Sequence, residues 1–161
     1  MGLLPILLAT SGLSIERVGI VVAVYPMVWA VSQLLFGPMS DRLGRRGLIV
    51  GGLIAQGVGV GGFAVTSGWF GSLGAAIVVG IGTGMVYPTL LAFVSDISKP
   101  ERRASALGVY RFWRDLGYAA GALGGGLTAD LLGLSHALYL TAVLSIFTAL
   151  AFAAVTGGET P

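Results

Sequence analysis

The fold is decided by residues 47–95, which read GLIVGGLIAQGVGVGGFAVTSGWFGSLGAAIVVGIGTGMVYPTLLAFVS and contain no Asp, Glu, Lys or Arg. As a single helix these 49 residues would extend about 74 Å, more than twice the ~30 Å core of a bilayer. The stretch must therefore fold back on itself. The break is best placed at residues 67–72, where small turn formers and interfacial aromatics cluster. Two membrane-spanning helices are predicted, at about 47–66 and 71–94.

Further apolar runs lie on both sides of this stretch. They predict spans at about 18–37, 104–129 and 135–156, of which 104–129 alone contains charged residues, and a partial span at 1–9. The runs do not alternate polar and apolar residues as barrel strands do. An all-α transmembrane fold is predicted, with five complete spans, one partial amino-terminal helix and a single membrane domain over 1–161.

The composition agrees with a membrane protein and excludes several classes of function. Charged residues make up 10% of the chain, where a soluble domain has about 25%. The chain has no cysteine, and His136 is its single histidine, which argues against a metal centre. No nucleophile with an adjacent base appears, so we expect no enzyme activity and no cofactor. A net charge of +2 gives no reason to expect nucleic-acid binding.

Basic residues in the short connections predict the orientation. The connections at 38–46 and 95–103 carry six Lys or Arg residues, whereas the opposite side carries only Arg17. Because cytoplasmic loops are enriched in Lys and Arg, both connections and the carboxyl tail are expected in the cytoplasm.

Glycines spaced four apart predict close helix packing, since small residues let helix backbones approach in lipid. The longest such series has three members in a row: Gly117, Gly121 and Gly125.

The sharpest local motif is GPMSDRLGRR at residues 37–46, between two predicted spans. Gly37 permits close helix contact and Gly44 a tight turn. Asp41 lies near the start of the following helix, where the helix dipole favours an anion. Three arginines follow as partners: Arg42, Arg45 and Arg46. A plain charged loop that obeys the positive-inside rule is the competing interpretation.

This motif resembles the hallmark loop of the major facilitator superfamily of secondary transporters, G-x-L-x-D-R-x-G-R-[RK], and departs from it only at Pro38 and Met39. The likeness covers essentially the whole chain, because residues 87–108 resemble the family's next helix pair and 110–118 its carboxyl-terminal half.

The resemblance implies one six-helix half of a carrier that has twelve helices and its binding site between two halves. Such a carrier moves a small solute by alternating access. A motif between helices eight and nine makes this chain the carboxyl-terminal half, which the ending at 158–161 favours; a motif between helices two and three is the other register.

The resemblance also implies a cytoplasmic charge cluster that latches the outward-open state. Asp41 and Arg45 would join Asp96 and one of two further arginines, Arg102 or Arg103. Static anchoring is the alternative, since exposed ion pairs contribute only about 0 to 1 kcal/mol.

A second group of polar residues shares one helix face: Arg111, Arg114, Asp115 and Tyr118. Deep in the membrane it would serve as a substrate counter-ion or proton relay. The favoured alternative is an interfacial group, with both arginines extended to the surface and Asp115 paired to Arg111. Tyr87 and Thr89 are the expected substrate contacts, because the family uses that helix to line its cavity.

The expected partners are a small-molecule substrate, a coupling proton or other ion, the lipid bilayer, and either a missing amino-terminal half or a second copy. The expected location is a prokaryotic plasma membrane, with the carboxyl terminus in the cytoplasm. Two alternatives stay open: a helical membrane protein that packs with a partner without transporting, and a half-carrier that dimerises with itself.

Overall fold

A computed structural model describes residues 2–66 and 68–157, and these residues form helices and no strand. The predicted all-α fold is therefore confirmed. The elements are α1 (Leu4–Thr10), α2 (Ile15–Leu43), α3 (Arg45–Val65), α4 (Trp69–Ile97), the 3₁₀ turn η1 (Pro100–Arg102), α5 (Arg103–Leu132) and α6 (Leu134–Thr156). Three parts of the chain named in the predictions lie outside the described residues: Met1, Ser67 and the tail 158–161.

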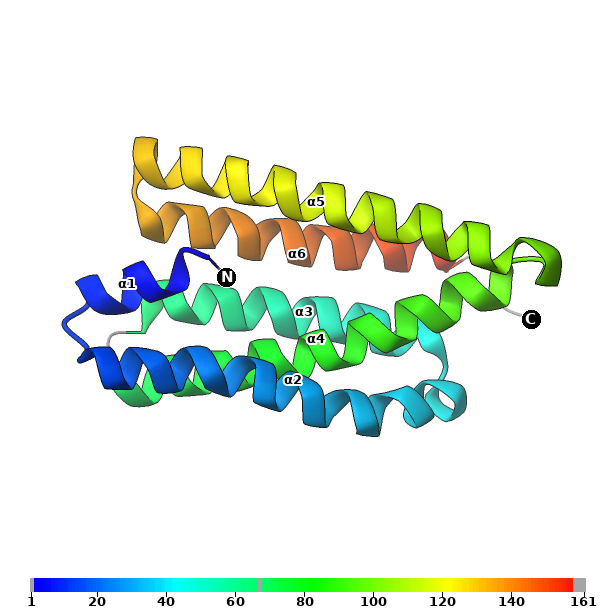
Figure 1. Ribbon diagram of the computed structural model, residues 1–161, viewed down its shortest axis with the longest axis horizontal. Helices are drawn as coiled ribbons and strands as arrows, with labels where there is room; N and C mark the ends of the chain where they lie inside the picture. Colours follow the sequence, from blue (N-terminus) through cyan, green and yellow to red (C-terminus); the bar gives the residue numbers. More distant parts are fainter. Residues whose placement is uncertain (1, 67, 158–161) are drawn as a thin grey trace.

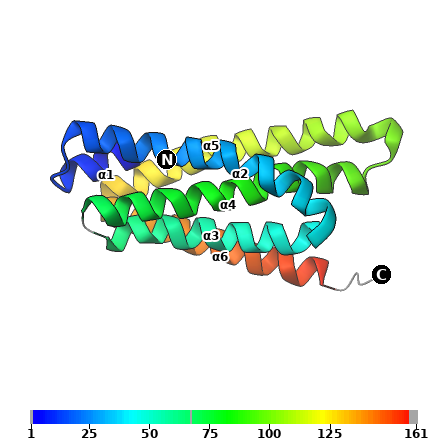
Figure 2. The same cartoon turned by 90° about the horizontal axis from the view of Figure 1, so that it is seen from below.

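The five long helices run along one common direction (Figures 1 and 2), and in the view of Figure 1 α5 and α6 lie at one edge of the bundle and α2 at the other. The α2–α3 and α4–α5 connections lie at the same end of the bundle as the end of α6 (Figure 1). The α1–α2 and α5–α6 connections lie at the opposite end. The two arginine-rich connections thus share one end, as the charge pattern requires.

The helices extend further into the predicted connections than the uncharged runs suggest. Helix α2 continues to Leu43 and α3 begins at Arg45, so only Gly44 interrupts the helix within 38–46. Gly44 has φ of +85°, a left-handed conformation that lets the chain reverse there without a Cβ clash. Most of the motif is therefore a helix end, which places its side chains on defined faces.

Four described helices are long and apolar enough to cross a bilayer: α2, α3, α4 and α6. Helix α5 is not among them, although its 30 residues give it the length. It carries charged side chains in its first half and six glycines, which lower its hydropathy. The span expected at 104–129 therefore stays a prediction.

Helix α4 packs between α2 and α3, and α6 packs on α3. Glycines make these contacts close. A Cβ on Gly82 would lie 2.6 Å from the carbonyl oxygen of Gly52 on α3, and one on Gly80 would lie 2.9 Å from that of Tyr25 on α2. A Cβ on Gly57 would lie 2.9 Å from the carbonyl oxygen of Ala142 on α6. No side chain larger than hydrogen fits at these crossings, so backbone-to-backbone packing holds these four helices together.

Candidate functional site

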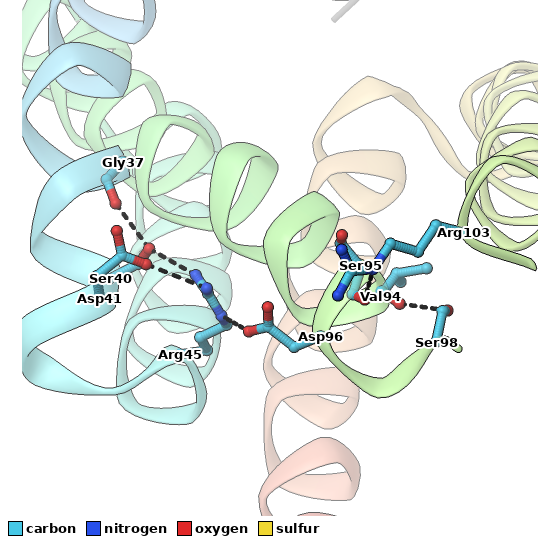
Figure 3. Close-up of polar contacts among 9 residues, drawn as sticks. All are labelled: Gly37, Ser40, Asp41, Arg45, Val94, Ser95, Asp96, Ser98 and Arg103. Carbon is cyan, nitrogen blue, oxygen red and sulfur yellow. Dashed lines mark hydrogen bonds and ion pairs between the residues drawn. The ribbon is translucent and has the colours of Figure 1, made fainter. Parts of the chain in front are cut away.

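Arg45 is the centre of a polar cluster at the arginine-rich end of the bundle (Figure 3). Its guanidinium forms ion pairs with Asp41, at 3.1 Å, and with Asp96 at the end of α4. It also donates to the Ser40 hydroxyl at 3.1 Å, and that hydroxyl donates to the Gly37 carbonyl at 2.7 Å. One side chain at the start of α3 thereby ties the ends of α2 and α4 together.

The hydrogen bond to Asp96 raises the pKa of the Arg45 guanidinium above its usual value, and the charges of Asp96 and Asp41 act in the same direction. The side chains of both acids are more than half exposed, while that of Arg45 is 21% exposed. Water and salt therefore screen the pairs, and each contributes about 0 to 1 kcal/mol. Such pairs can exchange partners at low cost.

The other arginines at this end of the bundle do not form the ion pairs predicted for the charge cluster. Arg103 donates to the Ser95 carbonyl at 3.1 Å, as Figure 3 shows, and forms no ion pair with an acid among the described residues. Arg42 and Arg102 likewise have no acidic partner within the part of the chain that the structure describes. The expectation that Arg102 or Arg103 pairs with the acids is therefore not met, because Arg45 alone bridges both carboxylates.

Arg46 points away from this cluster. It donates to the Ala153 carbonyl at 2.6 Å, near the end of α6. The last carbonyls of a helix lack intrahelical donors, so a cation there stabilises the helix end. The consecutive arginines 45 and 46 thus connect the start of α3 to three other helices, α2, α4 and α6.

A cavity of about 1100 Å³ lies between α5 and the remaining helices, and every α-helix of the chain contributes to its wall. Most of the wall is apolar, for example Val60, Phe63 and Leu138. Ten lining side chains are polar: Tyr25, Gln56, Thr83, Tyr87, Tyr110, Arg114, Tyr118, Thr128, Thr141 and Ser145. A mainly apolar pocket with a few convergent polar groups is typical of a small-molecule site.

Arg114 joins α5 to α4 across this cavity. Its NH1 donates to the Tyr87 hydroxyl at 3.0 Å, and its Cζ lies 5.6 Å from the centre of the Tyr87 ring. Its Nε and NH2 contact the carboxylate of Asp115 at 2.9 and 2.8 Å. The favoured pairing of Asp115 with Arg111 is wrong in this structure, because the neighbouring Arg114 takes that carboxylate.

The predicted site residues divide between the cavity and its outside. Tyr87, Arg114 and Tyr118 line the cavity, whereas Arg111 and Asp115 do not. Thr89, expected to contact substrate, is fully buried and lies outside the cavity wall, with no hydrogen-bond partner for its hydroxyl among the described residues. Two positions after Tyr87, it lies on a different helix face.

No role at a substrate site was predicted for two other polar residues of the cavity, Tyr110 and Thr83. Tyr110 lies one helical turn before Arg114 and lines the cavity with it. Thr83, one turn before Tyr87, accepts a hydrogen bond at 3.0 Å from Gln56 of α3. The four-residue spacings 83–87 and 110–114 are the signal that could have identified both residues.

The glycine series of α5 packs against no other helix among the described residues. A Cβ on Gly117 or Gly121 would meet no atom within 4 Å, and one on Gly125 would reach only Leu3, at 3.8 Å. All three glycines line the cavity. Their role in helix packing therefore stays a prediction.

Across 2–66 and 68–157, no group of three or more His, Cys, Asp or Glu residues could hold a metal ion.

Comparison with known proteins identifies the family. The sequence model of the Major Facilitator Superfamily matches residues 1–161. The inner membrane transport protein YajR of Escherichia coli is 31% identical over 147 residues, which cover 88% of this chain and 32% of that protein. The quinolone resistance protein NorA of Staphylococcus aureus is 27% identical over 128 residues, 80% of this chain and 33% of that protein.

A chloramphenicol resistance protein of Pseudomonas aeruginosa is 34% identical over 93 residues, 58% of this chain and 22% of that protein. The chain spans about a third of the length of YajR and NorA. Its four long apolar helices, together with these relatives, make it an integral membrane protein. The chain belongs to the Major Facilitator Superfamily, whose members are membrane transporters and not enzymes.

Proposed function

We propose that this chain forms one half of a carrier that moves a small solute across the membrane by alternating access. The observation that carries the proposal is the cavity between α5 and the other helices, in which α4 and α5 bring Tyr87 and Arg114 together at 3.0 Å. Polar and charged groups inside a membrane domain are costly and usually serve a substrate or ion pathway. A second six-helix body supplies the facing wall.

The Arg45 cluster is the proposed latch of this carrier. Its ion pairs connect three helix ends at one end of the bundle, and their exposure keeps each pair weak. Rocking of the two halves can therefore break the Asp41 and Asp96 contacts and form them again within one transport cycle. A coupling proton or other ion remains part of the proposal, with Arg114 and Asp115 as the charged groups nearest the cavity.

The orientation follows from the shared end of the arginine-rich connections. We place that end, with the end of α6, in the cytoplasm of a prokaryotic cell, because basic loops stay on the cytoplasmic side. The name of the E. coli relative supports the inner, or plasma, membrane as the location. The names of two other relatives, a chloramphenicol resistance protein and a quinolone resistance protein, make drug-like organic molecules candidate solutes.

The absence of native cysteine permits a direct test by labelling. Gly121→Cys, which faces the cavity, should react with a water-soluble maleimide from either side of the membrane when the chain is co-expressed with an amino-terminal half. The matched control is Leu123→Cys, on the same helix and outside the cavity wall, which should react from neither side.

Labelling of Gly121→Cys from one side only would contradict alternating access. Equal labelling with the chain expressed alone, together with a stable self-dimer in detergent, would favour the half-carrier that dimerises with itself.

A further inference from the structure

We propose that the cavity binds a solute with an anionic group on a flat apolar body, and that Arg114 holds the anion. This inference rests on the proposed function, since it names the chemistry of the solute that the same cavity carries. It follows from the hydrogen-bond donors, the charges and the shape of the cavity wall.

Arg114 has more hydrogen-bond donors than its observed contacts use. A guanidinium has five N–H donors in a rigid, planar fork. Two contact the Asp115 carboxylate and one the Tyr87 hydroxyl. Two donors are therefore left within the described structure, one on each terminal nitrogen, and Arg114 lines the cavity. Terminal N–H groups of this kind suit a carboxylate or a similar planar anion.

The charge on the cavity wall is positive. Arg114 is the single charged side chain among the described residues that line the wall, and no acid is among them. Its partner Asp115 lies outside the wall, with its side chain 62% exposed against 22% for Arg114. Water screens the exposed Asp115 carboxylate, so Arg114 binds it more weakly than it would bind an enclosed carboxylate. An anion in the cavity can therefore bind Arg114 beside Asp115 or in its place. A cationic solute would meet Arg114 with no compensating acid.

The cavity wall opposite α4 presents flat surfaces. Gly117 and Gly121 leave space above the α5 backbone where a Cβ would touch nothing within 4 Å. Aromatic rings of Tyr87, Tyr110 and Tyr118 border the same space. Rings and bare backbone present flat surfaces, and aromatic faces stack on planar apolar groups. The wall thus favours a flat body beside the anion.

Three probes of one shape and different charge test this inference: 2-naphthoate, 2-naphthamide and 2-naphthylmethylammonium. Their binding is measured at neutral pH by equilibrium dialysis against the protein in nanodiscs, with empty nanodiscs subtracted to remove partition into lipid. The protein is the chain co-expressed with an amino-terminal half. We expect naphthoate to bind about tenfold more tightly than the amide, as a charge-assisted hydrogen bond would give, and the ammonium probe to bind most weakly.

Variants assign the preference to one residue. Arg114→Gln should bind naphthoate and naphthamide equally, and Arg114→Lys should keep part of the preference. The matched control is Arg111→Gln, which removes the same charge one turn away and outside the cavity wall, and it should bind all three probes as the unmodified protein does. If Arg114→Gln does not fold, the Lys variant and the order of the three probes carry the test.

Equal binding of the three probes, or tightest binding of the ammonium probe, would overturn the inference and leave the cavity as a transport site. The same loss of preference in Arg111→Gln would overturn the assignment to Arg114. Binding of none of the probes would overturn the inference, while labelling of Gly121→Cys reports on the proposed function independently.

Discussion

Helices α4 and α5 have nearly the same length, 29 and 30 residues, and both are rich in glycine, yet they pack in opposite ways. Nine residues of α4 are buried, and none of α5 is. Gly80, Gly82 and Gly84 of α4 lie in contact with α2 or α3, while the three spaced glycines of α5 face a cavity. Glycine spacing alone therefore indicates that a helix can approach another closely, and does not show that it does.

The contrast has a functional side. Helix α4 is held along its length by backbone contacts and at its end by the Arg45 ion pairs. Helix α5 contacts α6 and α4 and presents its polar residues and glycines to open space. A solute can therefore bind between the tightly packed helix α4 and the less packed helix α5 without displacing α2, α3 or α4.

The largest expected effect is on folding. Gly82→Val places a branched side chain where a Cβ already lies 2.6 Å from the Gly52 carbonyl oxygen. Neither backbone can shift without separating α3 from α4, so we expect a loss of about 3 kcal/mol or more. Gly121→Val, at an open position of α5, should change stability by less than about 0.5 kcal/mol. Unfolding in detergent by SDS titration measures both. Equal losses would show that α5 packs as tightly as α4.

An intermediate effect is expected at the charge pair of α5. Arg114→Gln and Asp115→Asn should each lower stability, but by far less than Gly82→Val does, because the Asp115 side chain is 62% exposed and water screens the pair. The double variant should lose less than the sum of the two. The control pairs Arg111→Gln with Asp115→Asn, which should be closer to additive, since these two residues form no ion pair among the described residues. The same unfolding titration provides the free energies, and additivity for 114 with 115 would contradict the observed pairing.

The smallest effect on stability is expected at the end of α4. Asp96→Asn removes an exposed ion pair between α3 and α4, and Asp41→Asn removes one between residues four apart. Each should cost less than about 1 kcal/mol, with Asp41→Asn the smaller change. Transport in the co-expressed carrier should fall much more than expression does in both variants, since the proposed latch needs the charge. Normal transport rates in both variants would reduce the cluster to a static anchor.

The long uncharged runs were sufficient to predict the helices, although not their ends. A backbone in lipid must satisfy its own hydrogen bonds, so an apolar run of about 20 residues has few alternatives to a helix. The extension of α2 to Leu43 was not predicted, because charged residues end a span without ending a helix. The connection through Gly44 and the shared end of the arginines also followed from local sequence.

The candidate site was predictable only in part. Tyr87 was an expected substrate contact and lines the cavity. Arg114 and Tyr118, for which an interfacial role was favoured, line it too, while Thr89 is buried outside the cavity wall. Cavity-lining and buried positions cannot be told apart in the sequence, because the sequence of an apolar helix does not indicate which neighbouring helix a polar residue faces. The approach of Arg114 to Tyr87 joins residues 27 positions apart, which no local pattern connects.

The sequence by itself determined three properties of this protein: it is a helical membrane protein, the chain reverses direction at identifiable positions between helices, and two identifiable connections carry the positive charge. These properties depend on local hydrophobicity and on backbone hydrogen bonds within each helix. The tertiary structure alone decided which glycines touch a neighbour, which carboxylate Arg114 pairs with, and which polar residues enclose the cavity. Those outcomes depend on how each helix is rotated about its axis, and a helix that is apolar all round has no face that sets this rotation in advance.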